Sequence, residues 1–111
     1  MNQPYYEIRK GLSGRLHYVL TAPNGEIIGS CSGKKTREEI YSMIDQTRVC
    51  SQDLKNYERK LGTNQQPYFN LWNHDRTILL LKSELYKQNS GRENGIDAMI
   101  KYAPTTQVFV R

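Results

Sequence analysis

Few of the residues that build metal sites and catalytic centres occur in this 111-residue sequence, which has two cysteines and two histidines. Neither Cys31 nor Cys50 has a second cysteine or a histidine at the short spacing that a zinc site uses. We therefore expect two reduced, partly buried thiols and no bound metal or cofactor.

The two histidines do not indicate a catalytic centre either. A general base must lie within hydrogen-bonding reach of a nucleophile and of an orienting carboxylate. His17 is expected on the polar face of a strand, and His74-Asp75 in a turn, where aspartate is favoured for turn geometry. Since no set of acid, base and nucleophile can be assembled, we expect a protein that is not an enzyme.

Long apolar runs are absent as well. No window approaches the length of a membrane span, and residues 1–4 lead into Tyr5-Tyr6 without the basic and apolar segments of a secretory signal. The expectation is a cytoplasmic protein that makes no membrane contact.

Basic residues outnumber acidic ones by 16 to 11, which gives a net charge of +5 and favours anionic partners at long range. Because Lys34-Lys35, Arg37 and Arg59-Lys60 are interspersed with acids, an ordinary solvated surface is favoured over a nucleic-acid-binding patch. Residues 29–33 lack the spacing of a phosphate-binding loop. The lysines that follow them, at a predicted helix N-terminus, offer at most a weak anion site.

Tyrosine is unusually common, with eight residues, whereas apolar residues make up 37% of the sequence and the mean hydropathy is −0.75. The low apolar content predicts a thin core that the whole chain shares. Tyrosine favours half-buried sheet faces, on which the ring packs and the hydroxyl stays hydrated. We therefore expect β-structure with one solvated side.

An internal repeat organises the chain. We expect a single domain, residues 1–111, built of one copy at about residues 5–50 and another at about 54–104, followed by a tail, 105–111, that adds a short strand or remains loose. The matches at one offset are Tyr6-Glu7 with Tyr57-Glu58, Tyr18 with Phe69, Leu20 with Leu71, Ile27 with Ile78 and Ile28 with Leu79.

Three strands are predicted in the first copy, over residues 5–10, 15–22 and 26–31, because apolar and polar residues alternate there. Asn24-Gly25 supplies the turn before the third strand, since glycine tolerates a positive φ. The face expected to meet the core consists of Leu16, Tyr18, Leu20 and Ala22.

The strands of the second copy are predicted over residues 54–61, 68–73 and 77–82. The last of these is a nearly continuous apolar run. Such a run indicates a strand that is buried on both faces, or an edge strand that a homodimer would pair.

One helix follows the strands in each copy. Thr36 and Glu39 form a predicted capping box, in which each side chain accepts a hydrogen bond from the other residue's N–H, and Ser90 with Glu93 is predicted to repeat it. An apolar stripe at helical spacing follows each box and should pack on the sheet. The stripes consist of Ile40, Met43 and Ile44 in the first copy, and Ile96, Met99, Ile100 and Ala103 in the second.

Several segments together resemble the YegP-like family of small bacterial tandem-repeat proteins, over nearly the whole chain. In the second copy they are Tyr57-Glu58 to Lys60, Pro67-Tyr68-Phe69-Asn70-Leu71, Ser83-Glu84-Leu85-Tyr86 and Glu93-Asn94-Gly95-Ile96. The family's Asn-Gly-Glu turn is present in the first copy as Asn24-Gly25-Glu26, whereas the second copy has His74-Asp75-Arg76-Thr77 there.

Where the second copy has Asn94-Gly95-Ile96, the first copy has Glu38-Glu39-Ile40, so each copy has lost the other's glycine. Gly25 is expected at a positive φ in its turn, and Gly95 at a close approach of helix to sheet. The resemblance implies an α+β fold of two strand-strand-strand-helix repeats, and single-repeat members of the family pair as dimers. It implies no activity, because the family's function is unknown.

The predicted fold class is α+β: two tandem βββα repeats whose antiparallel sheet is packed by two helices, with a pseudo-twofold axis. For function we predict a small binding module for a protein partner or for a second copy of itself. The alternative is nucleic-acid binding through a basic, aromatic sheet face, whose rings could equally belong to the core or to a dimer interface. The candidate residues of that face are Tyr5, Arg15, His17, Tyr68 and Trp72.

Overall fold

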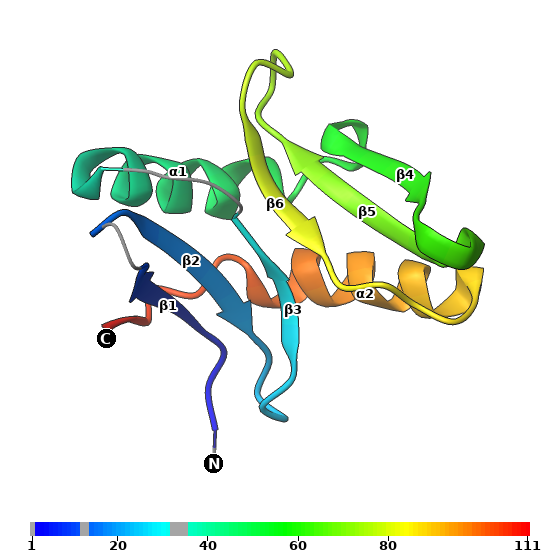
Figure 1. Cartoon of the computed structure of the whole chain (residues 1–111), viewed down its shortest axis with the longest axis horizontal. Coiled ribbons are helices and arrows are strands. Elements are labelled where there is room, and N and C mark those ends of the chain that lie inside the picture. The colour runs from blue at the N-terminus through cyan, green and yellow to red at the C-terminus, as the bar shows by residue number, and fades with distance from the viewer. Residues whose placement is uncertain (1, 12–13, 32–35) are drawn as a thin grey trace.

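Strands precede each of two helices in the computed structural model, which describes residues 2–11, 14–31 and 36–111. The elements are β1 (Tyr5–Lys10), β2 (Leu16–Thr21), β3 (Ile27–Ser30), α1 (Arg37–Cys50), β4 (Tyr57–Leu61), β5 (Pro67–Trp72), β6 (Leu79–Ser83), α2 (Asn89–Tyr102) and β7 (Val108–Val110). The strands form one seven-stranded mixed sheet in the order β4-β5-β6-β3-β2-β1-β7. Figure 1 shows both helices behind the strands. The α+β class is confirmed.

Two antiparallel meanders make up most of the sheet, β1-β2-β3 and β4-β5-β6. They meet where β3 pairs with β6 through two residue pairs, Gly29 with Ser83 and Ser30 with Lys82. At one edge β7 lies parallel to β1, so the tail adds a short strand. The two halves of the sheet are therefore held together by a short joint.

The turns from β2 to β3 and from β5 to β6 contain the same hydrogen bond. The Gly25 N–H donates to the Ala22 carbonyl at 2.9 Å, and the Arg76 N–H donates to the Asn73 carbonyl at 3.0 Å. The φ of Gly25 is +88°, which confirms its predicted conformation, and the φ of Arg76 is 58°. The arginine holds this unusual conformation while its guanidinium donates to the Lys55 carbonyl at 2.8 Å.

The capping box of the first helix is confirmed, whereas the one predicted for the second helix is wrong. The Glu39 N–H donates to Thr36 Oγ1 at 3.2 Å, and the Thr36 N–H donates to Glu39 Oε1 at 3.1 Å. Helix α2 instead follows Gln88, whose side chain makes no capping hydrogen bond. The Glu93 carboxylate is used elsewhere, because it accepts from Arg59 at 2.7 Å.

The core lies between the sheet and the helices and contains the predicted apolar stripes. Helix α1 packs against β2, β5 and β6, and α2 packs against β3 and β5, so each helix contacts both halves of the sheet. Ile44 is buried, and Ile100 is half-buried and packs against the core. On β2, Tyr18 and Leu20 of the predicted inward face are buried, but Val19 and Thr21 of the opposite face are buried too, so this strand does not have the expected solvated side along its whole length.

Three tyrosines are buried, contrary to the expectation of hydrated hydroxyls. The Tyr6 hydroxyl donates to the Ala103 carbonyl at the end of α2 at 2.7 Å, and the Tyr57 hydroxyl donates to the Ser51 carbonyl at the end of α1 at 2.9 Å. The Tyr18 hydroxyl donates to a carbonyl of β6. The bonds from Tyr6 and Tyr57 satisfy carbonyls that a helix end leaves unpaired. Burial raises the pKa of all three phenols, so they stay protonated donors.

One strand prediction in the second half is corrected, and for the other one of its two alternatives, a strand buried on both faces, is confirmed. Residues 54–56 form a 3₁₀ turn in which Asp53 accepts from the Lys55 N–H at 3.0 Å, so β4 begins only at Tyr57. The apolar run 77–82 supplies β6, which pairs with β5 on one side and β3 on the other. A homodimer cannot pair β6, because the edges of the described sheet are β4 and β7. Dimerisation itself stays a prediction.

Gly29 offers a test of the joint between β3 and β6. A Cβ on this residue would lie 2.3 Å from Leu81 Cδ2 and 2.7 Å from the Lys82 carbonyl oxygen, which cannot move without disturbing the sheet. We expect Gly29→Ala to lower the free energy of unfolding in urea by about 1–3 kcal/mol, as overpacking does. In the control Gly11→Ala, the new Cβ would lie 3.4 Å from its nearest neighbour. Equal losses in the two variants would contradict the prediction.

Candidate functional site

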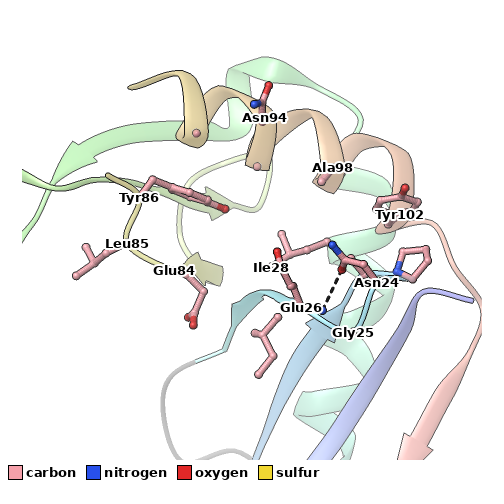
Figure 2. Close-up of a pocket in the computed structure, with 15 residues that line it drawn as sticks. Asn24, Gly25, Glu26, Ile28, Glu84, Leu85, Tyr86, Asn94, Ala98 and Tyr102 are labelled. Atoms are coloured by element: carbon pink, nitrogen blue, oxygen red, sulfur yellow. Dashed lines mark hydrogen bonds between the residues drawn. The ribbon is translucent and has the colours of Figure 1, made fainter. Parts of the chain in front are cut away.

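A cleft of about 870 Å³ opens between helix α2 and the turn that joins β2 to β3. Three segments line it: residues 22–28, residues 84–86 directly after β6, and the face of α2 that includes Gly91, Gly95 and Tyr102. Figure 2 shows the turn on one side and α2 on the other. The volume is typical of a small-ligand site. One wall comes from the first half of the chain and the others come from the second half.

The first wall is a tight turn that its own side chains stabilise. Asn24 Oδ1 accepts from the Glu26 N–H at 3.0 Å, the bond drawn in Figure 2. Gly25 at positive φ lets the chain reverse between these residues. Ala22 and Ile28, which flank the turn, are buried and supply apolar surface to the cleft.

The second wall is the segment that leaves β6. The Tyr86 N–H donates to the Pro67 carbonyl at 2.8 Å, which holds the segment against β5. The Glu84 N–H donates to the Ile28 carbonyl at 3.4 Å, directly beyond the β3–β6 joint. The Ser83 hydroxyl donates to the Glu84 carbonyl at 2.9 Å. Glu84 and Tyr86 are thus positioned by backbone contacts with both halves.

Tyr86 lies against two glycines of α2. A Cβ on Gly95 would lie 2.2 Å from the Tyr86 hydroxyl oxygen and 3.2 Å from Phe69 Cε2, and a Cβ on Gly91 would lie 3.3 Å from the Tyr86 Cβ. Residues four apart share one face of a helix, so the two glycines form a flat surface for the ring. The close approach predicted for Gly95 is confirmed, and Tyr86 is its nearest partner.

Two carboxylates give the cleft a negative potential. Burial raises the pKa of the Tyr86 phenol, and the charges of Glu84 and Glu26 raise it further, so both carboxylates act on one hydroxyl. In Figure 2 this hydroxyl points toward the space between α2 and the turn. No lysine, arginine or histidine occurs among the described residues that line the cleft.

The residues predicted to form a binding face lie on one side of the sheet but do not gather there. Tyr5, His17, Tyr68 and Trp72 alternate with buried neighbours and so lie opposite the helices, while Arg15 is exposed just before β2. Strands β3 and β6 separate the first two residues from the two on β5. Tyr68 and Trp72 share one face of β5, about 13 Å apart along the strand with Asn70 between them, so the structure does not gather the predicted residues into one platform.

The sheet surface around β5 holds these two rings in place. Glu58 Oε1 accepts from Trp72 Nε1 at 3.0 Å and from Asn70 Nδ2 at 3.2 Å. The Lys82 ammonium lies 4.9 Å from the centre of the Tyr68 ring. Trp72 is half-buried, so its exposure favours neither a stacking ring on a binding face nor a residue of the core.

Sequence reasoning selects Gly25 and Gly95 but does not place them together. It gives each glycine a steric role within its own copy, whereas both line the same cleft. Glu26, Glu84 and Tyr86 have no place among the predicted site residues. The signal that could have found them is the family resemblance, because the segments that carry it, 24–26, 83–86 and 93–96, meet at the cleft.

Other candidate chemistry finds little support. Cys31 and Cys50 are both buried. Within residues 2–11, 14–31 and 36–111, no three histidine, cysteine, aspartate or glutamate side chains cluster as a metal site requires. The helices in that part of the chain are too short or too polar to cross a membrane. The weak anion site predicted at Lys34-Lys35 lies outside the described residues.

Comparison with known proteins finds relatives along the whole chain. Residues 63–109 match a domain of unknown function, DUF1508. A UPF0339 protein of Acinetobacter baylyi is 32% identical over 94% of this chain and 93% of its own length, and the UPF0339 protein YegP of Yersinia pestis is 31% identical over 94% and 92%. A UPF0339 protein of Shewanella oneidensis, solved by NMR, has a TM-score of 0.91 at 25% identity and covers 97% of this chain and 91% of its own. The NMR structure of Escherichia coli yegP, described as a protein of unknown function, has a TM-score of 0.92 at 24% identity over 100% and 95%.

The Glu58–Trp72 bond predicts a pH-dependent fluorescence change. The bonds from Trp72 and Asn70 hold the pKa of the Glu58 carboxyl below its ordinary value of 4.5. The stability that this carboxylate contributes is complete above the ordinary pKa and is lost as pH falls through the lowered one. Emission of Trp72, the only tryptophan, should therefore change with a midpoint below pH 4.5, and Glu58→Gln should abolish the change. Glu38→Gln, at an exposed position on α1, is the control and should retain it. A midpoint above 4.5 would contradict the assignment.

Proposed function

Because the chain belongs to the UPF0339 family of small bacterial proteins that includes YegP, a family of unknown function, we propose a role from the geometry of the cleft. The protein is a non-enzymatic binding module, and the cleft holds a ligand with a positively charged group on an apolar stem. The observation that carries the proposal is that Glu26 and Glu84 line one cleft with Tyr86 and the apolar surface of Ala22 and Ile28, with no cation in the described lining.

We infer that the chain is a tandem duplication with a pseudo-twofold axis at the β3–β6 joint. The strand order supports this, because β6-β5-β4 on one side of the joint matches β3-β2-β1 on the other. The first turn of each half supports it too: the Gly11 N–H donates to the Arg15 carbonyl at 2.8 Å, and the Gly62 N–H donates to the Gln66 carbonyl at 2.8 Å.

Such a duplication would create two clefts, and the chain keeps the features of one. At the matching position, the turn of Asn73 faces α1 across a shallower depression of about 490 Å³, lined by Gln46 and Val49. Repeat matching places Glu39 where α2 has Gly95, so α1 lacks at that position the flat surface on which Tyr86 lies. This asymmetry explains why each copy has lost one glycine: a single composite cleft needs only one turn and one helix face.

The ligand class follows from the charges and rings of the lining. Glu26 and Glu84 attract a cation, and the face of Tyr86 can contact an ammonium or guanidinium group, whereas the Lys101 ammonium already lies over the Tyr102 ring. Apolar surface from Ile28 suits the stem that carries the charge. The net charge of +5 does not oppose binding strongly, because physiological salt screens charges beyond about 8 Å. An arginine or lysine side chain of a partner protein has this chemistry, as has a free amine.

Binding without catalysis is the simpler interpretation of this lining. A general base needs a pKa near the working pH. The Tyr86 phenol has its pKa raised by burial and by two carboxylates, so it is a hydrogen-bond donor rather than a base or nucleophile. Serine, cysteine and histidine do not occur among the described lining residues.

Nucleic-acid binding is a second candidate function, and one observation favours it. Tyr68 and Trp72 lie on the same face of β5, with Lys60 on β4 and Lys82 on β6 beside them. Rings flanked by cations are the basis of single-strand binding by sheets. The surface is smaller than the predicted face, because Tyr5, Arg15 and His17 do not contribute to it.

The cleft proposal is tested with a pair of peptides, acetyl-Leu-Arg-Leu-amide and the same peptide with citrulline, which is the neutral isostere of arginine. We expect calorimetry to show binding of the arginine form only, and Glu26→Gln/Glu84→Gln to weaken it by about tenfold or more, equivalent to about 1.4 kcal/mol. Glu38→Gln/Asp97→Asn removes the same charge at exposed positions outside the cleft and should have little effect. Agmatine tests a free amine as the source of the charge. Equal binding of both peptides would overturn the proposal.

Gly95→Ala tests the same cleft without changing its charge. The new Cβ would meet the hydroxyl end of Tyr86, which can swing away, and would lie 3.2 Å from Cε2 of the buried Phe69. Binding of the arginine peptide should fall under conditions in which the variant remains folded, and the urea midpoint should fall as well.

Nucleic-acid binding, the second candidate function, predicts that single-stranded oligonucleotides quench the fluorescence of Trp72 and that their affinity falls steeply with salt. Lys60→Gln/Lys82→Gln should weaken this binding more than Lys55→Gln/Lys87→Gln, which removes the same charge elsewhere. Absence of quenching at low salt would remove this function.

A further inference from the structure

A second groove, of about 400 Å³, lies at the other end of β2 from the cleft. Three cations from separate segments line it: Lys10 at the end of β1, Arg37 at the start of α1, and Arg111 just after β7. The described lining contains no acidic residue. The net charge of the protein is therefore not spread evenly, because the cleft is acidic and this groove is basic.

The backbone holds the three segments together. The Arg111 N–H donates to the Ile8 carbonyl at 3.0 Å, which places Arg111 beside the strand that ends in Lys10. Arg37 is the first residue of α1 and follows the confirmed cap at Thr36, which also lines the groove. The cations are thus supplied by the ends of regular elements.

The positive charges of the groove are only partly neutralised. Arg111 Nε lies 3.5 Å from Glu7 Oε2, and Glu7 also pairs with Arg9. Because Glu7 lies on the face of the sheet opposite the helices, this pair holds the Arg111 guanidinium away from Arg37. No carboxylate of the described residues pairs with Lys10 or Arg37. The Arg37 guanidinium lies over a ring instead, 5.8 Å from the centre of Tyr41. Cations that share a groove without a carboxylate repel one another, and a bound anion would remove this repulsion.

The remaining walls are apolar. Ile8 is buried beneath the groove, Leu16 is half-buried, and Tyr41 and Val110 are exposed along its sides. An inorganic ion would contact the cations and leave this surface exposed to water. A phosphate group on an apolar or aromatic body would use both parts, and arginine matches the geometry of phosphate oxygens.

We propose that this groove binds a small phosphate monoester, with its phosphate between Lys10 and Arg37 and its apolar body against Tyr41 and Val110. The site is independent of the proposed cleft, since it differs in charge and in place. Its ligand is a dianion, which the two cations without a carboxylate partner, Lys10 and Arg37, suit better than they suit a carboxylate.

Phenyl phosphate is the probe, with inorganic phosphate and benzoate as comparisons, all at low salt. We expect calorimetry to show phenyl phosphate binding more tightly than either, and amide shifts at Tyr41 and Val110 on addition of it. Lys10→Gln/Arg37→Gln should weaken the binding by about tenfold or more. Lys55→Gln/Lys87→Gln removes the same charge at exposed positions outside the groove and should change it less than about twofold.

Four results would overturn the proposal. Absence of amide shifts would remove the site. Equal weakening by the two double variants would show that the binding depends only on the net charge of the protein. Inorganic phosphate binding as tightly as phenyl phosphate would show that the groove does not recognise the apolar body, and tighter binding of benzoate would exclude phosphate as the group recognised.

Lys10 and Arg37 are exposed, so the variants should fold. Tyr41→Ala provides a second test, since it should weaken the binding of phenyl phosphate but not that of inorganic phosphate.

Discussion

The antiparallel pairing of β3 with β6 is the constraint on which the rest of the structure depends. Two residue pairs join the meanders there, and Gly29 must lack a side chain because Leu81 and the Lys82 carbonyl occupy the space beside it. Directly beyond the joint, the Glu84 N–H donates to the Ile28 carbonyl, and both residues line the cleft. The cleft is therefore a continuation of the joint, and a change that separated the halves would abolish it.

Reciprocal hydrogen bonds from tyrosine fix the helices to this sheet. Tyr6, from the first half, donates to the end of α2, and Tyr57, from the second half, donates to the end of α1. Both phenols are buried, so losing either partner would leave an unsatisfied polar group in the core. Since the position of α2 sets its separation from the turn at Gly25, the buried hydroxyls also set the width of the cleft.

The two proposed sites share one physical logic. Each collects charge of a single sign from segments that are distant in the sequence and places it beside apolar surface, where contacts are less exposed to solvent. The acidic cleft and the basic groove lie at opposite ends of β2, so the net charge of +5 conceals both. Neither site needs a catalytic group, and both need the tertiary arrangement of the chain.

The sequence by itself determined the features whose signals are local: the alternation of β1, the cap at Thr36, the positive φ of Gly25 and the apolar stripes of the helices. It misjudged Glu93, which pairs with Arg59 instead of capping α2, and it left open whether the run 77–82 is an edge or a central strand. Only the tertiary structure decided these, and only it placed Gly25, Glu84 and Gly95 on one cleft. The reason is that their proximity depends on the β3–β6 pairing, a contact between distant segments that no periodicity of the chain encodes.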